Sequence, residues 1–301
     1  MKKLMTIACL MLLFLIPFLQ KASAAESTLP AKWEELTAPN FVKAVSQSAK
    51  VCIIPLGIIE KHGPHMPLGT DLIDARAQVL NAVKEEYAVV FPEYYVGQIN
   101  EARHQPGVIA YSPDLVWKML QETCNEISRN GFEKIIFVNG HGGNNDLVKY
   151  FCMSQLSEKR NYAVYLFQPK TDANEHKKVD ELMKKLPPST GDHAGATETS
   201  YMMVVRPDLV KIDKASTQSG DDLNRLVNLP NTYTGIWWYA KFPNHYAGDA
   251  KYATQELGRA MLDEDVRQLV RMIREVKADT KVLELQKQFF EASQHPLDTK
   301  Q

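Results

Sequence analysis

Three short runs of this sequence concentrate histidines and carboxylates. They are EKHGPHMPLGTD at residues 60–71, NGHGGN at 139–144 and DHAGATETS at 192–200. Imidazole nitrogens and carboxylate oxygens together form the ligand set that zinc, manganese and iron take in hydrolytic sites, and one carboxylate can bridge two such metals. The residues that could supply this set are Glu60, His62, Asp71, His141 and Glu198.

The same residues also allow a simpler interpretation, because spacing alone does not show that the three runs converge. Glu60 and Asp71 could cap helices, and His62 and His65 could be surface residues of a loop. The glycines at 140–143 could form only a turn or an anion-binding loop. Both interpretations stay open on the residues alone.

The chain around these runs predicts the elements that must position them. Short apolar segments alternate with segments that carry apolar residues at helical spacing, which is typical of parallel βαβ units. Strands are predicted at 51–59, 88–91, 134–138 and 162–167, and helices at 71–87, 112–131 and 145–159. We therefore predict a single α/β domain with a mostly parallel β-sheet flanked by helices. Such folds bind ligands in loops after the carboxyl ends of their strands.

Two later segments carry no motif of their own. Residues 168–192 are polar and predict a surface excursion with a short amphipathic helix. Residues 221–249 combine Trp and Tyr with Gly and Pro, as in long ordered loops that carry function. A final helix is predicted over 250–277 and a further one to 290.

Composition excludes several classes of protein. The 301 residues hold 35 Lys and Arg against 36 Asp and Glu, for a formal charge of -1, and 45% are hydrophobic. These are the values of an ordinary globular protein without the basic footprint of a nucleic-acid partner. Beyond the N-terminal segment the chain keeps Cys52, Cys124 and Cys152, an odd number that predicts free buried thiols rather than a disulfide framework.

The N-terminal residues predict a secretory signal peptide. Lys2 and Lys3 precede an uncharged apolar stretch at 4–19, and Ala22 and Ala24 supply the small side chains of a cleavage site. The stretch is short for a membrane anchor, which needs about 20 residues. We predict a signal peptide at 1–24, a linker at 25–32, one domain at 33–290 and a tail at 291–301. The mature protein is expected to be exported, periplasmic or secreted, and free of the membrane.

The three runs together resemble the motifs of the creatininase (creatinine amidohydrolase) family. They occur in the family order, and the resemblance extends from Ile53 to the helix that contains Glu256 and Gly258. It implies a single α/β domain that binds two divalent metal ions per chain, usually zinc, manganese or iron. It further implies hydrolysis of C–N bonds in small amides, and a homo-oligomer that is commonly a hexamer.

The resemblance also implies roles for individual residues. Glu60, His62, Asp71 and His141 match metal ligands, with Asp71 as the bridge. Creatininase proper has a glutamate two residues after the histidine that matches His141, whereas this chain has glycine at position 143. Glu198 is therefore expected to act as the fifth ligand. The departure moves the chain away from creatinine itself, toward a broader family that includes formamide-cleaving deformylases and a peptide-cleaving branch.

Other residues are expected around the metals. His193 matches a family histidine with an acid/base role and is predicted to deliver a proton to the leaving nitrogen, the alternative being a helix cap. Outer partners of the ligands are predicted at His65 and Asn139. Substrate contacts are predicted at His104, Trp237 and Trp238, although a plain loop histidine and core aromatics would fit as well. His176, His245 and His295 receive no role.

The sequence therefore predicts a metal-dependent hydrolase that cleaves the amide C–N bond of a small cyclic or linear amide through a metal-activated water at a dinuclear site. A peptidase of the same family is the alternative among enzymes. A catalytically idle ligand-binding domain is the alternative outside them, because a fold does not prescribe chemistry. A phosphate-binding loop at 140–144 would leave Glu60, His62 and Asp71 unexplained.

Overall fold

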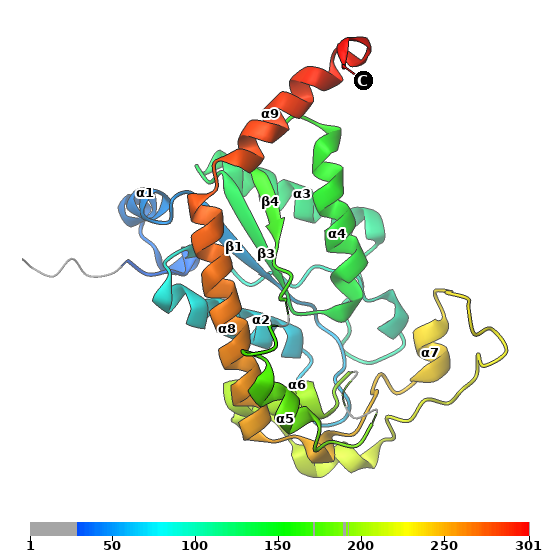
Figure 1. Ribbon diagram of the computed structural model, residues 1–301. Helices are drawn as coiled ribbons and strands as arrows, with labels where there is room; N and C mark the ends of the chain where they lie inside the picture. The colour runs from blue at the N-terminus through cyan, green and yellow to red at the C-terminus, as the bar shows by residue number, and fades with distance from the viewer. Residues whose placement is uncertain (1–28, 171, 189–190, 192, 301) are drawn as a thin grey trace, which may run out of the picture.

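A four-stranded parallel sheet forms the centre of the protein (Figure 1). The computed structural model describes residues 29–170, 172–188, 191 and 193–300, so the predicted signal peptide and half of the predicted linker lie outside the described residues. The strands are β1 (Val51–Leu56), β2 (Val89–Val90), β3 (Lys134–Asn139) and β4 (Ala163–Leu166), in the spatial order β2-β1-β3-β4. The predicted α/β architecture with a parallel sheet is confirmed.

The connections between strands are helical, as predicted. The chain runs from β1 through α2 (Thr70–Glu85) to β2, through α3 (Pro113–Arg129) to β3, and through α4 (Asn145–Ser154) to β4. Because β2 lies on one side of β1 and β3 on the other, the direction of winding reverses between β1 and β3. Ligand sites of open α/β sheets lie at this switch point. The loops 57–69 and 140–144 leave the sheet there.

Alternating strand residues build two separate layers of core. Val51 and Ile53 pack with α2 and with α8 (Gln255–Ala278) on one face. On the other face Cys52 packs with α3, α4 and α1 (Ala38–Gln47). The strand predicted to reach residue 59 ends at Leu56, because the following residues leave the sheet to form the loop of the first motif.

The third motif lies at the start of a helix that the periodicity did not reveal. This helix, α6 (Ala196–Val205), packs against α8 and α2. Most of its residues are small or apolar, so it lacks the polar face that makes an amphipathic helix visible in a sequence. A Cβ at Gly258 of α8 would overlap the Ser200 carbonyl oxygen, so glycine allows the two helices to approach closely.

The remaining elements extend this core. Residues 168–192 contain α5 (Lys177–Met183), residues 221–249 contain α7 (Trp237–Lys241), and α9 (Lys281–Ser293) projects away from the body of the molecule (Figure 1). The 3-10 turns are Trp33–Glu35, Asn100–Ala102, Gly142–Asn144, Gln155–Ser157, Pro207–Leu209, Ile212–Thr217, Ala250–Tyr252 and Pro296–Asp298. None of the helices in the described part of the chain is both long and apolar enough to cross a membrane. The three cysteines described are free thiols, two of them buried.

Candidate metal centre

The first helix turn of α2 passes very close to the ends of β1 and β3. A Cβ at Gly57 would lie 2.5 Å from the Leu72 nitrogen, and one at Gly140 would lie 2.6 Å from the Asp71 carbonyl oxygen. Glycine at both positions therefore lets α2 begin directly above the sheet. This brings the side chain of Asp71 between the loop after β1 and the loop after β3.

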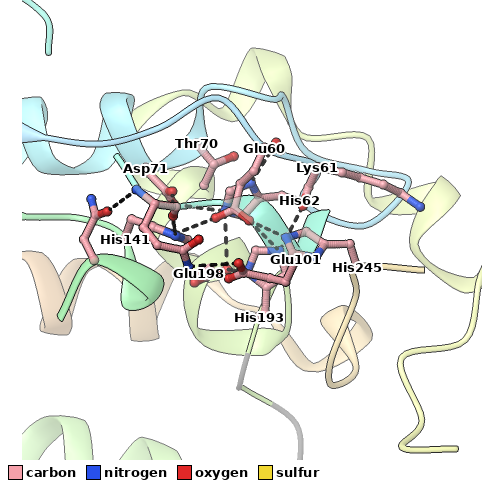
Figure 2. A network of polar contacts seen from close by, with 12 residues as sticks. Glu60, Lys61, His62, Thr70, Asp71, Glu101, His141, His193, Glu198 and His245 are labelled. Carbon is pink, nitrogen blue, oxygen red and sulfur yellow. Dashed lines mark hydrogen bonds and ion pairs between the residues drawn. The ribbon is translucent and has the colours of Figure 1, made fainter. Parts of the chain in front are cut away.

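Three acceptor atoms converge at this point (Figure 2). His141 Nδ1 lies 2.8 Å from Glu60 Oε1 and 3.2 Å from Asp71 Oδ2. The opposite ring nitrogen of His141 donates to the Gln98 carbonyl oxygen at 2.9 Å, which leaves Nδ1 with its lone pair. Apart from this imidazole, neither carboxylate oxygen has a hydrogen-bond partner among the described residues, and both are buried. Buried acceptors that face one another in this way fit a bound cation.

A second group of ligands shares Asp71 with the first. His62 Nε2 lies 3.0 Å from Asp71 Oδ1 and 3.9 Å from Glu198 Oε2. Glu198 is fixed by the Ala194 backbone nitrogen, which donates to its Oε2 at 2.5 Å. Asp71 thus directs one oxygen toward His62 and the other toward His141, as a bridging carboxylate would. The five predicted ligands are all brought together.

The field of these carboxylates is strongly negative. Burial opposes a charge on His62, but Asp71 and Glu60 outweigh it and raise the pKa of His62 to about 10. The same balance raises the pKa of His141 well above its ordinary value. Burial is the main reason that the pKa of Glu198 rises to about 7. A field that attracts protons to two imidazoles also attracts metal cations, which take the place of those protons.

His193 lies beside these ligands in a different state. Its Nε2 donates to the Lys61 carbonyl oxygen at 2.9 Å, so Nδ1 carries the lone pair, 3.8 Å from Glu198 Oε2. Burial lowers the pKa of His193 to about 3. The imidazole is therefore neutral near pH 7, and its Nδ1 can accept a proton or act as a ligand.

His245 is a site residue that the sequence did not reveal. Its Nε2 donates to Glu60 Oε2, and its Nδ1 accepts a hydrogen bond of 2.8 Å from the indole nitrogen of Trp238. The chain Trp238, His245 and Glu60 therefore orients the carboxylate whose other oxygen faces His141. Residue 245 belongs to no motif and lies over a hundred residues from the first two motifs, so no local signal could have found it.

The two predicted outer partners bond to the loop after β3 and to α6 rather than to the side chains of the predicted metal ligands. Asn139 donates to the His141 carbonyl oxygen at 2.6 Å and accepts from the His141 nitrogen at 3.3 Å, so it fixes the loop on both sides of that ligand. His65 Nε2 bonds to Thr199 Oγ1 at 2.9 Å. This contact joins the loop after β1 to α6, which carries Glu198.

Three of the five predicted ligands, Glu60, His141 and Glu198, line a pocket of about 270 Å³, which we call the metal pocket. Its size is near the lower end of ordinary ligand pockets, about 300–1,000 Å³. Trp237 and Trp238, two of the predicted substrate contacts, lie in its wall. His104 lies outside it: the His104 ring packs edge-on against Tyr239, and its Nε2 lies 2.8 Å from the Pro243 carbonyl oxygen.

Replacing Trp238 by Phe is expected to weaken metal binding about 10- to 100-fold, as loss of an outer hydrogen bond does at metal sites. The indole donor fixes His245, which in turn fixes Glu60. Competition with a chromophoric zinc chelator measures the affinity. Trp237→Phe is the control, since Trp237 lines the pocket without bonding to His245. Equal affinities for the two variants would contradict the orienting role of Trp238.

Comparison with known proteins identifies a family. The family model of creatinine amidohydrolase matches residues 34–273. Creatinine amidohydrolase of Pseudomonas putida is 25% identical over 191 residues, which are 60% of this chain and 74% of that protein. A mycofactocin precursor peptide peptidase of Mycolicibacterium smegmatis is 31% identical over 170 residues, or 54% of this chain and 60% of the relative.

Solved structures share the architecture described above. A creatininase structure described as the manganese form matches with a TM-score of 0.67 at 21% identity, and a mutant creatininase of the Zn-Zn type matches with 0.67 at 22%. Both matches cover 83% of this chain and 99% of the solved chain. At this level of identity the likeness establishes the fold.

Proposed function

The chain belongs to the creatinine amidohydrolase family, and on that premise we propose that it hydrolyses the C–N bond of a small cyclic or linear amide at a dinuclear metal site. The observation that carries the proposal is the placement of Asp71, whose two oxygens face two different groups of ligand atoms. Glu60 and His141 complete one group. His62 and Glu198 complete the other.

Two divalent ions fit this donor set, which mixes imidazole with carboxylate and suits zinc, manganese or iron. When bound, such ions lower the pKa of water and polarise an amide carbonyl. The likeness to creatininase structures of the manganese and Zn-Zn forms supports zinc or manganese. The protein itself holds the acceptors in place through Gln98, Ala194 and His245.

Amide hydrolysis also needs proton transfer, and the position of His193 beside the predicted ligands supports this role for it. Water adds to the carbonyl carbon, the C–N bond breaks, and the leaving nitrogen takes up one proton. The lone pair on His193 Nδ1 faces the metal pocket beside Glu198 and can accept the proton that water loses. The same nitrogen then returns it to the leaving amine.

Glu198 supports a substrate other than creatinine. Its Oε2 lies 3.9 Å from His62 Nε2, so it is available to the ion that His62 would bind. The carboxylate expected two residues after His141 is replaced by glycine. Because Glu198 reaches the site from α6, position 143 needs no ligand side chain. The space open to substrate beside Gly143 therefore differs in shape from that of a site with a glutamate there.

Metal content tests the proposal. Protein purified without chelators is expected to hold about two equivalents of first-row metal per chain, and a Glu198→Gln variant about one, because the amide is a poor metal ligand. Elemental analysis gives both numbers, and a panel of small amides gives the activity. Glu256→Gln is the matched control, since Glu256 is an exposed residue of α8 that pairs with Lys178.

Each outcome has a clear meaning. Full metal content and activity in Glu198→Gln would show that Glu198 is not a ligand. One equivalent in the unaltered protein would contradict the dinuclear site. No uptake of zinc or manganese at all would leave the idle ligand-binding domain as the better interpretation.

We also propose that the protein is exported and assembles into a homo-oligomer. The charge pattern of residues 1–24 and the membership in the family support these two statements respectively. The mass of the purified protein in solution, measured by light scattering, tests the assembly. N-terminal sequencing of the mature protein tests cleavage after Ala24.

A further inference from the structure

A second, larger cavity adjoins the metal pocket. This outer groove has a volume of about 670 Å³. Its walls come from residues 98–104, from the loop and first turn that begin α4, and from residues 233–239. Glu101 and Gly143 line both the outer groove and the metal pocket. The two spaces therefore meet between these residues, at a position that we call the neck.

Gly143 keeps the neck open. It has no positive φ, so its backbone conformation does not demand glycine. A Cβ at this position would lie 3.2 Å from Glu101 Oε1 and would collide with the imidazole of His141. Any side chain at 143 would therefore fill the neck. The preceding Gly142 differs, because a Cβ there would meet no atom within 4 Å.

Glu101 places a carboxylate in the neck. Its Oε2 accepts a hydrogen bond of 2.9 Å from Gln98 Nε2, which holds the side chain on one side. Its Oε1 faces the space over Gly143, and Figure 2 shows Glu101 close to the ligand cluster. No described residue donates a hydrogen bond to Oε1. An N–H group passing through the neck would find a charged acceptor there.

The outer groove is apolar on one side and polar on the other. Tyr233 and Ile236 are 83% and 55% exposed, and they form the apolar side together with Tyr239. Beyond the Glu101 carboxylate at the neck, Arg103 and Asp146 contribute one charge of each sign. Walls of this kind suit a neutral chain that carries an apolar side chain and backbone amides, rather than a strongly charged ligand.

We propose that the substrate is an extended, peptide-like amide that occupies both cavities. Its scissile C–N bond lies in the metal pocket, an N–H group of the adjoining unit binds Glu101 in the neck, and an apolar or aromatic side chain lies in the outer groove. This inference rests on the proposed function, because it places the reacting bond at the metal ligands. A compact amide would leave the neck and the outer groove unused.

Hydroxamates of different length test the proposal on the metal-loaded protein, because the hydroxamate group chelates metal ions directly. Acetohydroxamic acid fills only the metal pocket. A leucyl-tyrosyl hydroxamate and an N-formyl-N-hydroxy dipeptide extend from the chelating group on the two opposite sides. Isothermal titration calorimetry gives the Kd of each probe. One extended probe is expected to bind at least about 30-fold more tightly than acetohydroxamic acid.

Two variants locate the source of that gain. Glu101→Gln is expected to reduce the affinity advantage of the extended probe about tenfold, because the charged acceptor is lost. Gly235→Trp is expected to abolish most of it by filling the outer groove, and a Cβ at Gly235 meets no atom within 4 Å. Gly235→Trp, whose position lies outside the metal pocket, should not change the Kd of acetohydroxamic acid more than about twofold. Met153→Trp, an exposed position on α4 outside both cavities, is the matched control.

The outcomes separate this inference from the proposed function. Suppose that acetohydroxamic acid binds but neither extended probe binds more tightly, or that Gly235→Trp weakens all probes equally. The proposal of an extended substrate is then wrong, whereas the proposed metal site is not contradicted. If no hydroxamate binds to the metal-loaded protein, the proposed function and the inference both fail. Metal content is measured for every variant, so a loss of metal is not mistaken for a blocked groove.

Discussion

Replacing Asp71 by Asn is expected to remove both metal ions and to lower amide turnover by roughly three orders of magnitude or more. Asp71 faces both His62 and His141 through separate oxygens. Asparagine offers a single carbonyl oxygen, so it cannot serve two ions, and its amide hydrogens would face the ligand nitrogens. Elemental analysis and turnover of the same preparation check the prediction.

Thermal unfolding gives a second measure that does not depend on activity. Zinc in hundredfold excess over its Kd should stabilise the unaltered protein by about 2.7 kcal/mol and leave Asp71→Asn almost unchanged. Without metal, the variant should be less stable than the parent, because Asp71 is the buried partner of the His62 and His141 imidazoles, whose pKa values it raises. Asp263→Asn, an exposed position on α8, is the control. Retention of two equivalents by Asp71→Asn would refute the bridging role.

Replacing His193 by Gln is expected to lower turnover about 10²- to 10⁴-fold, the usual contribution of a general acid or base. The metal content should stay the same, because the five predicted ligands Glu60, His62, Asp71, His141 and Glu198 all remain in place, although His193 lies beside the ligand atoms of His62 and Glu198. Glutamine retains a polar group near Lys61 but cannot exchange a proton near neutral pH. Turnover, KM and metal content are measured on one preparation.

The choice of leaving group sharpens this test. The aniline released from an anilide with an electron-withdrawing ring can leave with little need of a proton. The amine released from an alkylamide must be protonated to leave. The His193→Gln variant should therefore lose much more activity on the alkylamide than on the anilide. His295→Gln serves as the control, because His295 is exposed and remote from the ligands. An equal loss on both substrates, or the loss of one metal equivalent, would assign His193 to the ligands instead.

The order of elements could be predicted from local pattern alone. The strands are short apolar runs, and helices such as α2 and α3 carry apolar residues on one face, so their periodicity records which side is buried. The helix predicted at 112–131 is α3, which begins at Pro113, and the Ser112 hydroxyl before it bonds to Asp114 rather than to the helix backbone. The helix α6 escaped notice because it is buried on most sides and has no such face.

The motifs indicated which residues could bind metal, because each places histidines or carboxylates within a few positions of one another in the sequence. The loop after β1 supplies Glu60 and His62, and the start of α2 supplies Asp71. The pairing of these groups follows from the parallel sheet. Once β1 and β3 lie side by side, the loops after them must share one edge, and the ligands of both motifs meet there.

Contacts between distant segments were decided only by the tertiary structure. His245 reaches Glu60 across 185 positions, and Trp238 reaches His245 within a segment that has no motif. Glu101 and Gly143 become neighbours because residues 98–104 fold over the loop after β3. Sequence periodicity records which face of an element is buried, but not what it is buried against. Packing of the whole chain alone sets those distances, and with them the hydrogen bonds that orient the ligands and the space left for a substrate.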